Sequence, residues 1–170
     1  LAPGKKARAA TPADAAGPAA MPSRPFGRSG IQVPILSLGG MFDIPSNQTL
    51  LKQAIQWGVT YWDTANTYMG GKSEEGIGRY LEKYPEDRKR IFLVTKSHAW
   101  TLNGLSQDLD VSIERMKTDY IDLFFVHSVR SIGDMDDDTK KWADKKKAQG
   151  KIRFFGFSTH SNMEACMLGA

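Results

Sequence analysis

Four polar residues each end a short apolar run, and their types are suited to proton chemistry. Asp63 ends VTYWD, Lys96 ends IFLVTK, His127 ends YIDLFFVH and Ser158 ends RFFGFS. Successive members are 31 to 33 positions apart, and each run is rich in the β-branched and aromatic residues that favour strands. The carboxyl ends of parallel strands meet at one edge of a sheet, so these four side chains would face a common mouth.

Each of the four also has an ordinary structural explanation. Asp63 could cap a turn in DTANT, and Lys96 could extend its ammonium group to solvent. His127 could be a hydrogen-bonded core histidine, and Ser158 could cap the final helix. These explanations are sufficient for each residue alone. The recurrence of polar residues at four strand ends instead favours a shared site.

The cluster could deliver a proton to a carbonyl oxygen. An aspartate beside a lysine keeps both groups charged, and Lys96 would stabilise the tyrosinate form of Tyr68, five positions after Asp63. Tyr68 would then be a better proton donor near neutral pH. His127 offers a further hydrogen bond to a substrate oxygen. None of these side chains is a source of electrons, so a reductive reaction would need a cofactor.

The elements that would position these residues alternate regularly along the chain. A hairpin is predicted over 25–33, with its turn at Gly27-Arg28-Ser29-Gly30. Strands are predicted over 34–38, 59–63, 91–96, 120–127 and 153–158. Helices are predicted over 46–58, 72–84, 105–117, 134–150 and from 161 onward.

This alternation and the near-constant unit length predict an α/β fold, a parallel (β/α) barrel of the TIM type with an N-terminal β-hairpin. A complete barrel has eight units and about 250 residues. The 170 residues provide about five units, so we expect a truncated barrel.

Composition and charge narrow the function classes. Residues 1–23 are rich in Ala, Pro and Gly, which predicts a disordered leader or linker, with the barrel portion over 24–170. Most of the net charge of +4 lies in the first 25 residues, so the basic balance does not indicate nucleic-acid binding. No apolar run approaches the roughly 20 residues needed to span a bilayer, and no membrane association is expected.

Two further expectations follow from the sequence. Cys166 is the only cysteine, which excludes a disulfide or a Cys-based metal site within this chain, and no metal is predicted. The chain begins at Leu1 and lacks a signal-peptide core. The location stays open, with cytoplasmic as the default expectation and export to the periplasm possible if a signal peptide precedes residue 1.

Several segments together resemble the aldo-keto reductase family. They are DTANTYMGGKSEEGIG from Asp63, LVTK and LFFVH at the next two strand ends, and GKIRFFGFS at the last. The predicted N-terminal hairpin is similar to the one that closes the barrel floor in that family. The resemblance covers roughly residues 24–170, and GFSTH and SLGGMFD look most like bacterial members.

The resemblance implies reversible NAD(P)H-dependent reduction of a small-molecule aldehyde or ketone to an alcohol. It makes Tyr68 the general acid, supported by Lys96, which Asp63 would hold in place. His127 would orient the carbonyl group. His98, two residues after Lys96, receives no role and is predicted to be a loop residue.

The resemblance also implies a nicotinamide site that includes Asp63. Gly40 and Met41 would line it, and Ser158 and Thr159 would reach the carboxamide. The family often has Ser-Asn where this chain has Ser158-Thr159, which weakens the assignment of Thr159. The resemblance favours NADP over NAD. The residues of this chain do not decide between the two cofactors, because the adenosine-phosphate site of the family barrel lies on later strands and helices.

Two other functions remain open at this stage. Lys96 could form a Schiff base on the same barrel, as in an aldolase-type lyase, although a paired, charged lysine is a poor nucleophile. The chain could also belong to a non-catalytic regulatory or binding subunit, like the channel-associated members of the family. The sequence does not predict an oligomeric state.

Overall fold

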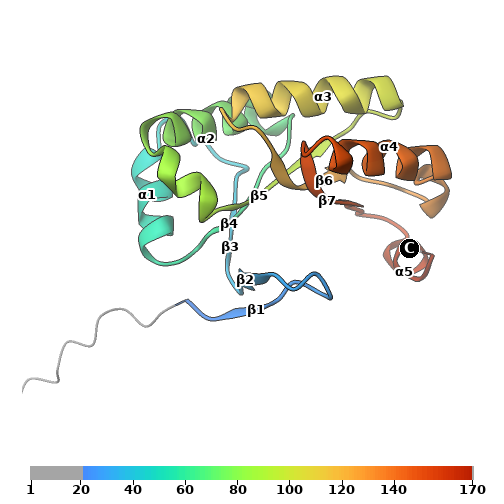
Figure 1. Ribbon diagram of the computed structural model, residues 1–170, viewed down its shortest axis with the longest axis horizontal. Coiled ribbons are helices and arrows are strands. Elements are labelled where there is room, and N and C mark those ends of the chain that lie inside the picture. The colour runs from blue at the N-terminus through green and yellow to red at the C-terminus, as the bar shows by residue number, and fades with distance from the viewer. Residues whose placement is uncertain (1–20, 170) are drawn as a thin grey trace, which may run out of the picture.

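The computed structural model describes residues 21–169, and it shows a hairpin followed by a parallel sheet with helices between its strands (Figure 1). The hairpin pairs two antiparallel strands, and the sheet has the order β3-β4-β5-β6-β7. The predicted alternation and the TIM-type barrel architecture are thus confirmed for this part of the chain. The strands are β1 (Ser23–Pro25), β2 (Gln32–Pro34), β3 (Ser37–Gly39), β4 (Tyr61–Asp63), β5 (Phe92–Ser97), β6 (Ile121–Val126) and β7 (Ile152–Phe157).

Helices α1 to α4 connect successive strands and α5 follows β7; α2, α3 and α4 lie together on one side of the sheet (Figure 1). Short 3₁₀ segments follow β4, α2 and β6. The α-helices are α1 (Gln48–Gln56), α2 (Lys72–Lys83), α3 (Leu102–Arg115), α4 (Asp137–Ala148) and α5 (Met163–Leu168). The 3₁₀ segments are η1 (Tyr68–Gly71), η2 (Pro85–Lys89) and η3 (Ile132–Asp134).

Side-chain caps explain why two helices begin elsewhere than predicted. Helix α3 starts at Leu102, before the predicted 105, because the Thr101 hydroxyl accepts a hydrogen bond from the Gly104 amide at 3.1 Å. The helix predicted from 134 begins only at Asp137, after Asp136, whose carboxylate accepts a hydrogen bond from Thr139 N at 2.8 Å. Ser158 does not cap the last helix, since Asn162 precedes α5.

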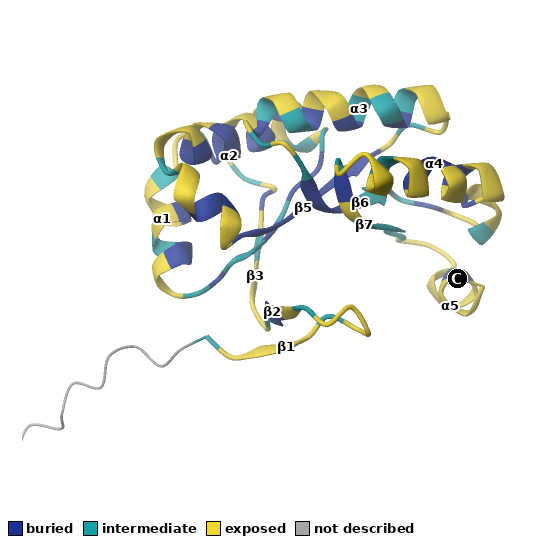
Figure 2. Cartoon of the chain, in the orientation of Figure 1, coloured by how far each residue is buried: buried dark blue, intermediate teal, exposed yellow. Residues whose placement is uncertain are grey.

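Two apolar clusters hold the sheet in place. The larger one lies between the sheet and its helices and includes Leu93, Leu109 and Phe124, each fully buried; Figure 2 shows strands β5 and β6 as the most deeply buried part. The smaller cluster lies between the sheet and the hairpin. There the Phe26 ring packs against Phe92, with ring centroids 5.1 Å apart. The hairpin therefore covers apolar surface that the helices do not reach.

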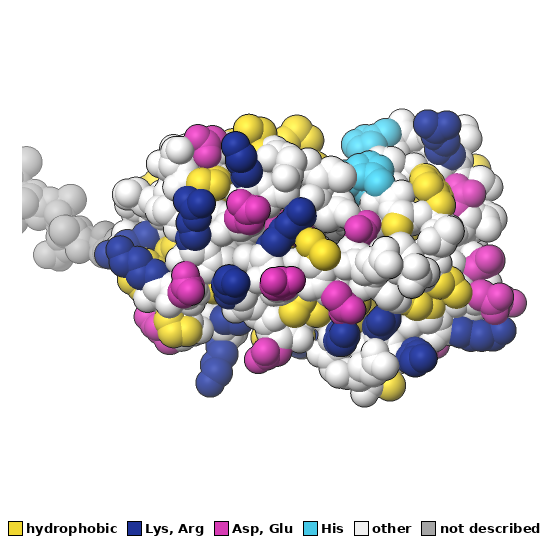
Figure 3. All heavy atoms as spheres, turned by 90° about the horizontal axis from the view of Figure 1, so that it is seen from above, with side chains coloured by type: hydrophobic (Ala, Val, Ile, Leu, Met, Phe, Trp, Pro, Cys, Tyr) yellow, Lys and Arg dark blue, Asp and Glu magenta, His cyan; other side chains and the backbone are white. Residues whose placement is uncertain are grey.

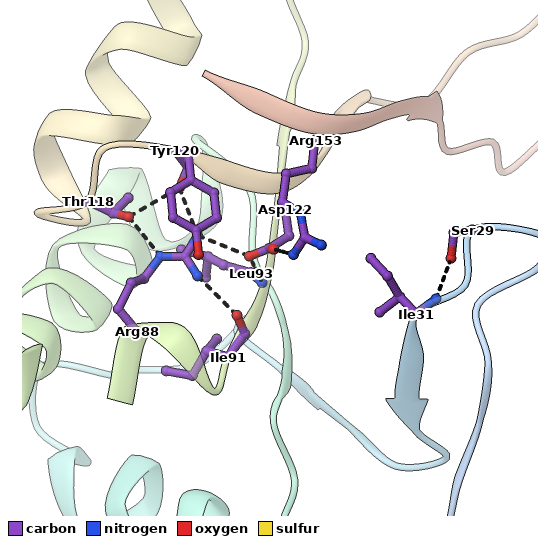
Figure 4. Close-up of polar contacts among 9 residues, drawn as sticks. All are labelled: Ser29, Ile31, Arg88, Ile91, Leu93, Thr118, Tyr120, Asp122 and Arg153. Carbon is purple, nitrogen blue, oxygen red and sulfur yellow. Dashed lines mark hydrogen bonds and ion pairs between the residues drawn. The ribbon is translucent and has the colours of Figure 1, made fainter. Parts of the chain in front are cut away.

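A buried ion-pair network joins three strands at their amino-terminal ends (Figure 4). Asp122, the second residue of β6, is only 1% exposed. Its carboxylate pairs with Arg88 at 3.0 Å and Arg153 at 2.6 Å, and it accepts a hydrogen bond from Leu93 N at 2.9 Å. Arg88 also stacks on the ring of Tyr120. A buried carboxylate needs such partners, so this cluster fixes the end of the sheet opposite the strand ends that carry the predicted site.

Near both ends of the described range, the chain still contacts the rest of the fold. Of the predicted leader 1–23, residues 1–20 lie outside the described residues, and Ser23 already belongs to β1. Pro22 O accepts a hydrogen bond from Ile35 N at 2.9 Å.

Within residues 21–169, no helix is both long and apolar enough to cross a membrane. Cys166 is buried in α5 with its thiol free.

Candidate active site

An ion pair lies at the carboxyl ends of β4 and β5. Lys96, only 6% exposed, places its Nζ 2.7 Å from Asp63 Oδ2 and 2.8 Å from the carbonyl oxygen of Thr64. The same Nζ is 3.4 Å from the hydroxyl oxygen of Tyr68 and 4.9 Å from the centroid of its ring. The lysine, aspartate and tyrosine singled out in the sequence therefore lie together. Nζ of Lys96 contacts both of the other side chains.

Tyr68 reaches Lys96 because the chain turns sharply after β4. Asn66 N donates to Lys96 O at 3.0 Å, which places this segment beside β5. Tyr68 then begins η1, where Met69 has a φ of 53° and Gly70 and Gly71 have φ values of 65° and 92°. A left-handed conformation disfavours residues with a Cβ atom, so the two glycines suit this turn and Met69 is an unfavourable residue there.

His127 forms the wall of the site next to Tyr68. The two rings meet edge to face, with centroids 5.9 Å apart. Burial, and then the nearby His98, Lys96 and His160, lower the pKa of His127 from 6.5 to about 4. The imidazole is therefore neutral at pH 7. Its Nδ1 is buried and has no hydrogen-bond partner among the described residues, so nothing in this part of the chain fixes the tautomer through that atom.

His98 is a site residue that the sequence reasoning missed. Its ring lies on that of His127, with centroids 4.0 Å apart, and its Nδ1 is 3.5 Å from the Thr67 hydroxyl. Histidine side chains gather at one place on the molecular surface (Figure 3). Strand periodicity singled out only the last residue of each strand, and His98 lies just beyond β5. Its spacing of two from Lys96 was the available signal.

The residues expected to hold a nicotinamide group flank this cluster. On one side, Gly40 N donates to Asp63 O at 2.7 Å, and a Cβ at Gly40 would lie 2.8 Å from Ser73 Oγ. Glycine is therefore required where the chain leaves β3. The neighbouring Met41 side chain is 68% exposed, so it is free to pack against a planar ring.

On the other side, Ser158 follows β7, next to the strand that carries His127. Its Oγ accepts from Ser128 N at 3.1 Å, which leaves the hydroxyl hydrogen for a ligand carbonyl. The Thr159 hydroxyl instead donates to Ser161 O at 2.6 Å within its own loop. The donor set therefore fits a carboxamide at Ser158, whereas Thr159 already uses its donor.

The arrangement can protonate an oxygen and stabilise the resulting phenolate. A hydroxyl donor, a paired ammonium group and a neutral imidazole surround one position at the edge of the sheet. No group of three or more potential metal ligands occurs between residues 21 and 169. The hydroxyl, ammonium and imidazole groups can supply a proton and charge stabilisation for a reaction at a carbonyl group.

Comparison with known proteins adds independent information. Residues 36–168 match the model of the Aldo/keto reductase family. The uncharacterized oxidoreductase YqkF of Bacillus subtilis is 32% identical in an alignment of 154 positions that covers 82% of this chain and 49% of that protein. The aldo-keto reductase yakc [NADP(+)] of Schizosaccharomyces pombe is 36% identical over 126 residues, covering 66% of this chain and 36% of that protein.

A solved structure shows the same arrangement of elements. An aldo-keto reductase from Bacillus halodurans, in a holo form, superposes with a TM-score of 0.72 at 28% identity. The match covers 82% of this chain and 51% of that one. The chain thus spans about half the length, or less, of these relatives.

Proposed function

The chain belongs to the aldo/keto reductase family, and from this premise we propose that the natural protein containing it reduces an aldehyde or ketone to an alcohol, with Tyr68 as general acid. One observation carries the proposal. Lys96 Nζ lies between the Asp63 carboxylate, at 2.7 Å, and the Tyr68 hydroxyl, at 3.4 Å. This is the geometry needed to stabilise a phenolate without leaving the lysine charge unpaired.

Each side chain then has a distinct task. Tyr68 donates its hydroxyl proton to the carbonyl oxygen as that oxygen becomes negative. The Lys96 ammonium stabilises the phenolate that remains, and Asp63 holds the ammonium in place. His127 is neutral at pH 7, so its N–H group can donate to the same substrate oxygen without adding a competing positive charge.

A bound nicotinamide cofactor would supply the hydride for this reduction. Gly40 and Met41 would hold one side of the ring, and Ser158 would hold the carboxamide. We assign NADP in preference to NAD, in line with the NADP(+) in the name of the Schizosaccharomyces pombe relative. Thr159 is left out of this set because its hydroxyl already donates within its own loop.

The alternative chemistry requires a different state of Lys96. A Schiff-base lyase needs a neutral amine that can attack a carbonyl carbon. Here Nζ lies against a carboxylate, a backbone carbonyl and a phenol, and all three contacts favour the ammonium form. A non-catalytic subunit would not require the four site residues to converge. Both alternatives are outcomes of the experiment below.

The test follows cofactor oxidation and product formation together. The protein, expressed at its natural full length, is incubated with NADPH or NADH and a panel of aldehydes, and the alcohol is identified by mass spectrometry. We expect one alcohol formed per nicotinamide oxidised. A substrate adduct trapped on Lys96 by borohydride would instead support the lyase. Nicotinamide binding without turnover of any aldehyde would support the non-catalytic subunit.

A further inference from the structure

Arg115, the last residue of α3, reaches the segment that carries Tyr68. Its Nη1 donates to the carbonyl oxygen of Asn66 at 3.0 Å. Its guanidinium group also lies flat against Gly71, where a Cβ atom would be only 2.6 Å from Arg115 Cζ. Asn66 and Gly71 are two positions before and three positions after Tyr68. One guanidinium group therefore contacts both ends of this short segment.

Glu74 connects the same guanidinium group to the strand that carries Lys96. Its side chain, in the first turn of α2, is fully buried, and burial raises its pKa. One carboxylate oxygen accepts from Thr95 Oγ1 at 2.6 Å, and the other lies 3.2 Å from Arg115 Nη1. Thr95 immediately precedes Lys96 in β5. The carboxylate thus joins the β5 strand to the arginine.

The segment between these contacts needs outside support. Its turn contains the left-handed Met69, a conformation that disfavours a side chain of this size. The distance of 3.4 Å between Lys96 Nζ and the Tyr68 hydroxyl is close to the upper limit for a hydrogen bond. A displacement of about 1 Å would break this contact, and such misplacements can lower turnover by about 10²-fold.

We propose that Arg115 and Glu74 form a positioning clamp that sets the distance between Tyr68 and Lys96. The clamp rests on the proposed function, since it acts through the general acid assigned there. Arginine suits this role because Nη1 carries two hydrogens, one for the Asn66 carbonyl oxygen and one for the Glu74 carboxylate, while the planar guanidinium group covers Gly71. A lysine at this position would bring one ammonium group and could not maintain all three contacts. Neither Arg115 nor Glu74 is proposed to touch the substrate.

The clamp is tested in the full-length protein with Arg115→Lys and Glu74→Gln, and with Arg79→Met as the control. Arg79 is an exposed arginine on α2. We expect the first two variants to lose about 10²-fold in kcat, with KM for NADPH within a few-fold of wild type. The pH above which turnover falls should also move upward, because a Tyr68 phenolate farther from Lys96 is less stabilised. Asp63, Lys96, His98 and His127 also titrate or carry charge beside Tyr68, and all four are unchanged in these variants.

A second measurement separates positioning from loss of folding. Arg115→Ala is assayed with and without millimolar ethylguanidinium, together with its circular dichroism spectrum. Partial recovery of kcat and of the wild-type pH profile would support the clamp. A wild-type protein that reduces aldehydes, with Arg115→Lys retaining its kcat and pH profile, would overturn the clamp alone. A wild-type protein that reduces no aldehyde would overturn the proposed function and the clamp with it.

Discussion

At the residue scale, the site depends on one lysine whose charge is kept by its neighbours. Lys96 is almost completely buried, yet Asp63 and the Thr64 carbonyl replace the hydration that its ammonium group gives up. The sequence indicates a special role for Lys96 because this polar residue ends an apolar strand. It could not supply the distances, because these depend on how β4 and β5 pair.

The Lys96→Met variant should separate catalysis from stability. We expect kcat for aldehyde reduction to fall by about 10³-fold, because the phenolate of Tyr68 loses its cation. The free energy of unfolding should fall by only about 1–2 kcal/mol, because Asp63 is partly exposed and regains water. Urea unfolding and steady-state kinetics measure the two effects, with the exposed Lys89→Met as the control. A loss of stability with near wild-type kcat would contradict the assignment.

His127 should make stability depend on pH. The pKa of this group is lowered to about 4 in the fold from an ordinary 6.5, so between these values the unfolded state binds more protons. The contribution of His127 to the free energy of unfolding is fully present above about pH 6.5. It is lost as the pH falls toward 4, and the loss reaches up to about 3 kcal/mol. Urea unfolding at pH 7.5 and pH 4.5 should show this loss in the wild type.

The matched controls are His127→Gln and His160→Gln. In His127→Gln, the free energy of unfolding should differ much less between pH 7.5 and pH 4.5 than in the wild type, since the titrating group is removed. His160→Gln replaces an exposed histidine and should retain most of the wild-type difference. If the free energy of unfolding changes equally with pH in the wild type and in His127→Gln, the pH dependence of stability comes from other groups.

At the scale of elements, the order and type of strands and helices could be predicted, and their boundaries lie within about three residues of the predicted ones. The periodic apolar positions in α2 and the β-branched residues of β5 mark their elements by local pattern alone. The start of α3 was predicted three residues late, because the cap at Thr101 precedes the first apolar residue of its buried stripe. The ion pair between Glu74 and Arg115 could not be predicted either. It joins residues 41 positions apart, and local patterns do not reveal such pairs.

The contact between α2 and α3 requires glycine at position 78. A Cβ atom there would lie 1.9 Å from the carbonyl oxygen of Arg115, so Gly78→Ala must push the two helices apart. We expect the free energy of unfolding to fall by about 3 kcal/mol. Gly133→Ala is the control, because its added Cβ would meet only Ser131 Oγ, at an ordinary 3.6 Å. Thermal unfolding with similar midpoints for the two variants would contradict this packing.

At the scale of the whole molecule, the described part of the chain corresponds to one side of a barrel. Within residues 21–169, strands β3 and β7 each pair with a neighbour on one side only. Large apolar side chains near these edges are exposed, among them Ile35, Leu36, Met167 and Leu168. Unpaired edges and uncovered apolar surface favour association with another strand or another molecule.

Residues 1–170 expressed alone should therefore self-associate or fold only in part, and they should show no aldehyde reduction. Size-exclusion chromatography with light scattering and differential scanning calorimetry would measure both properties. The natural full-length protein serves as the reference under the same conditions. A monomeric 170-residue chain with one cooperative thermal transition would contradict this prediction.

The central claim is that Tyr68 donates the proton, and its direct test is the turnover of Tyr68→Phe with nicotinamide binding measured alongside. Tyr84→Phe, which removes a phenol hydroxyl remote from Lys96, is the control. We predict that Tyr68→Phe lowers kcat by about 10³-fold while the Kd for NADPH, measured by fluorescence, changes by no more than a few-fold. A kcat for Tyr68→Phe within ten-fold of wild type would contradict the claim.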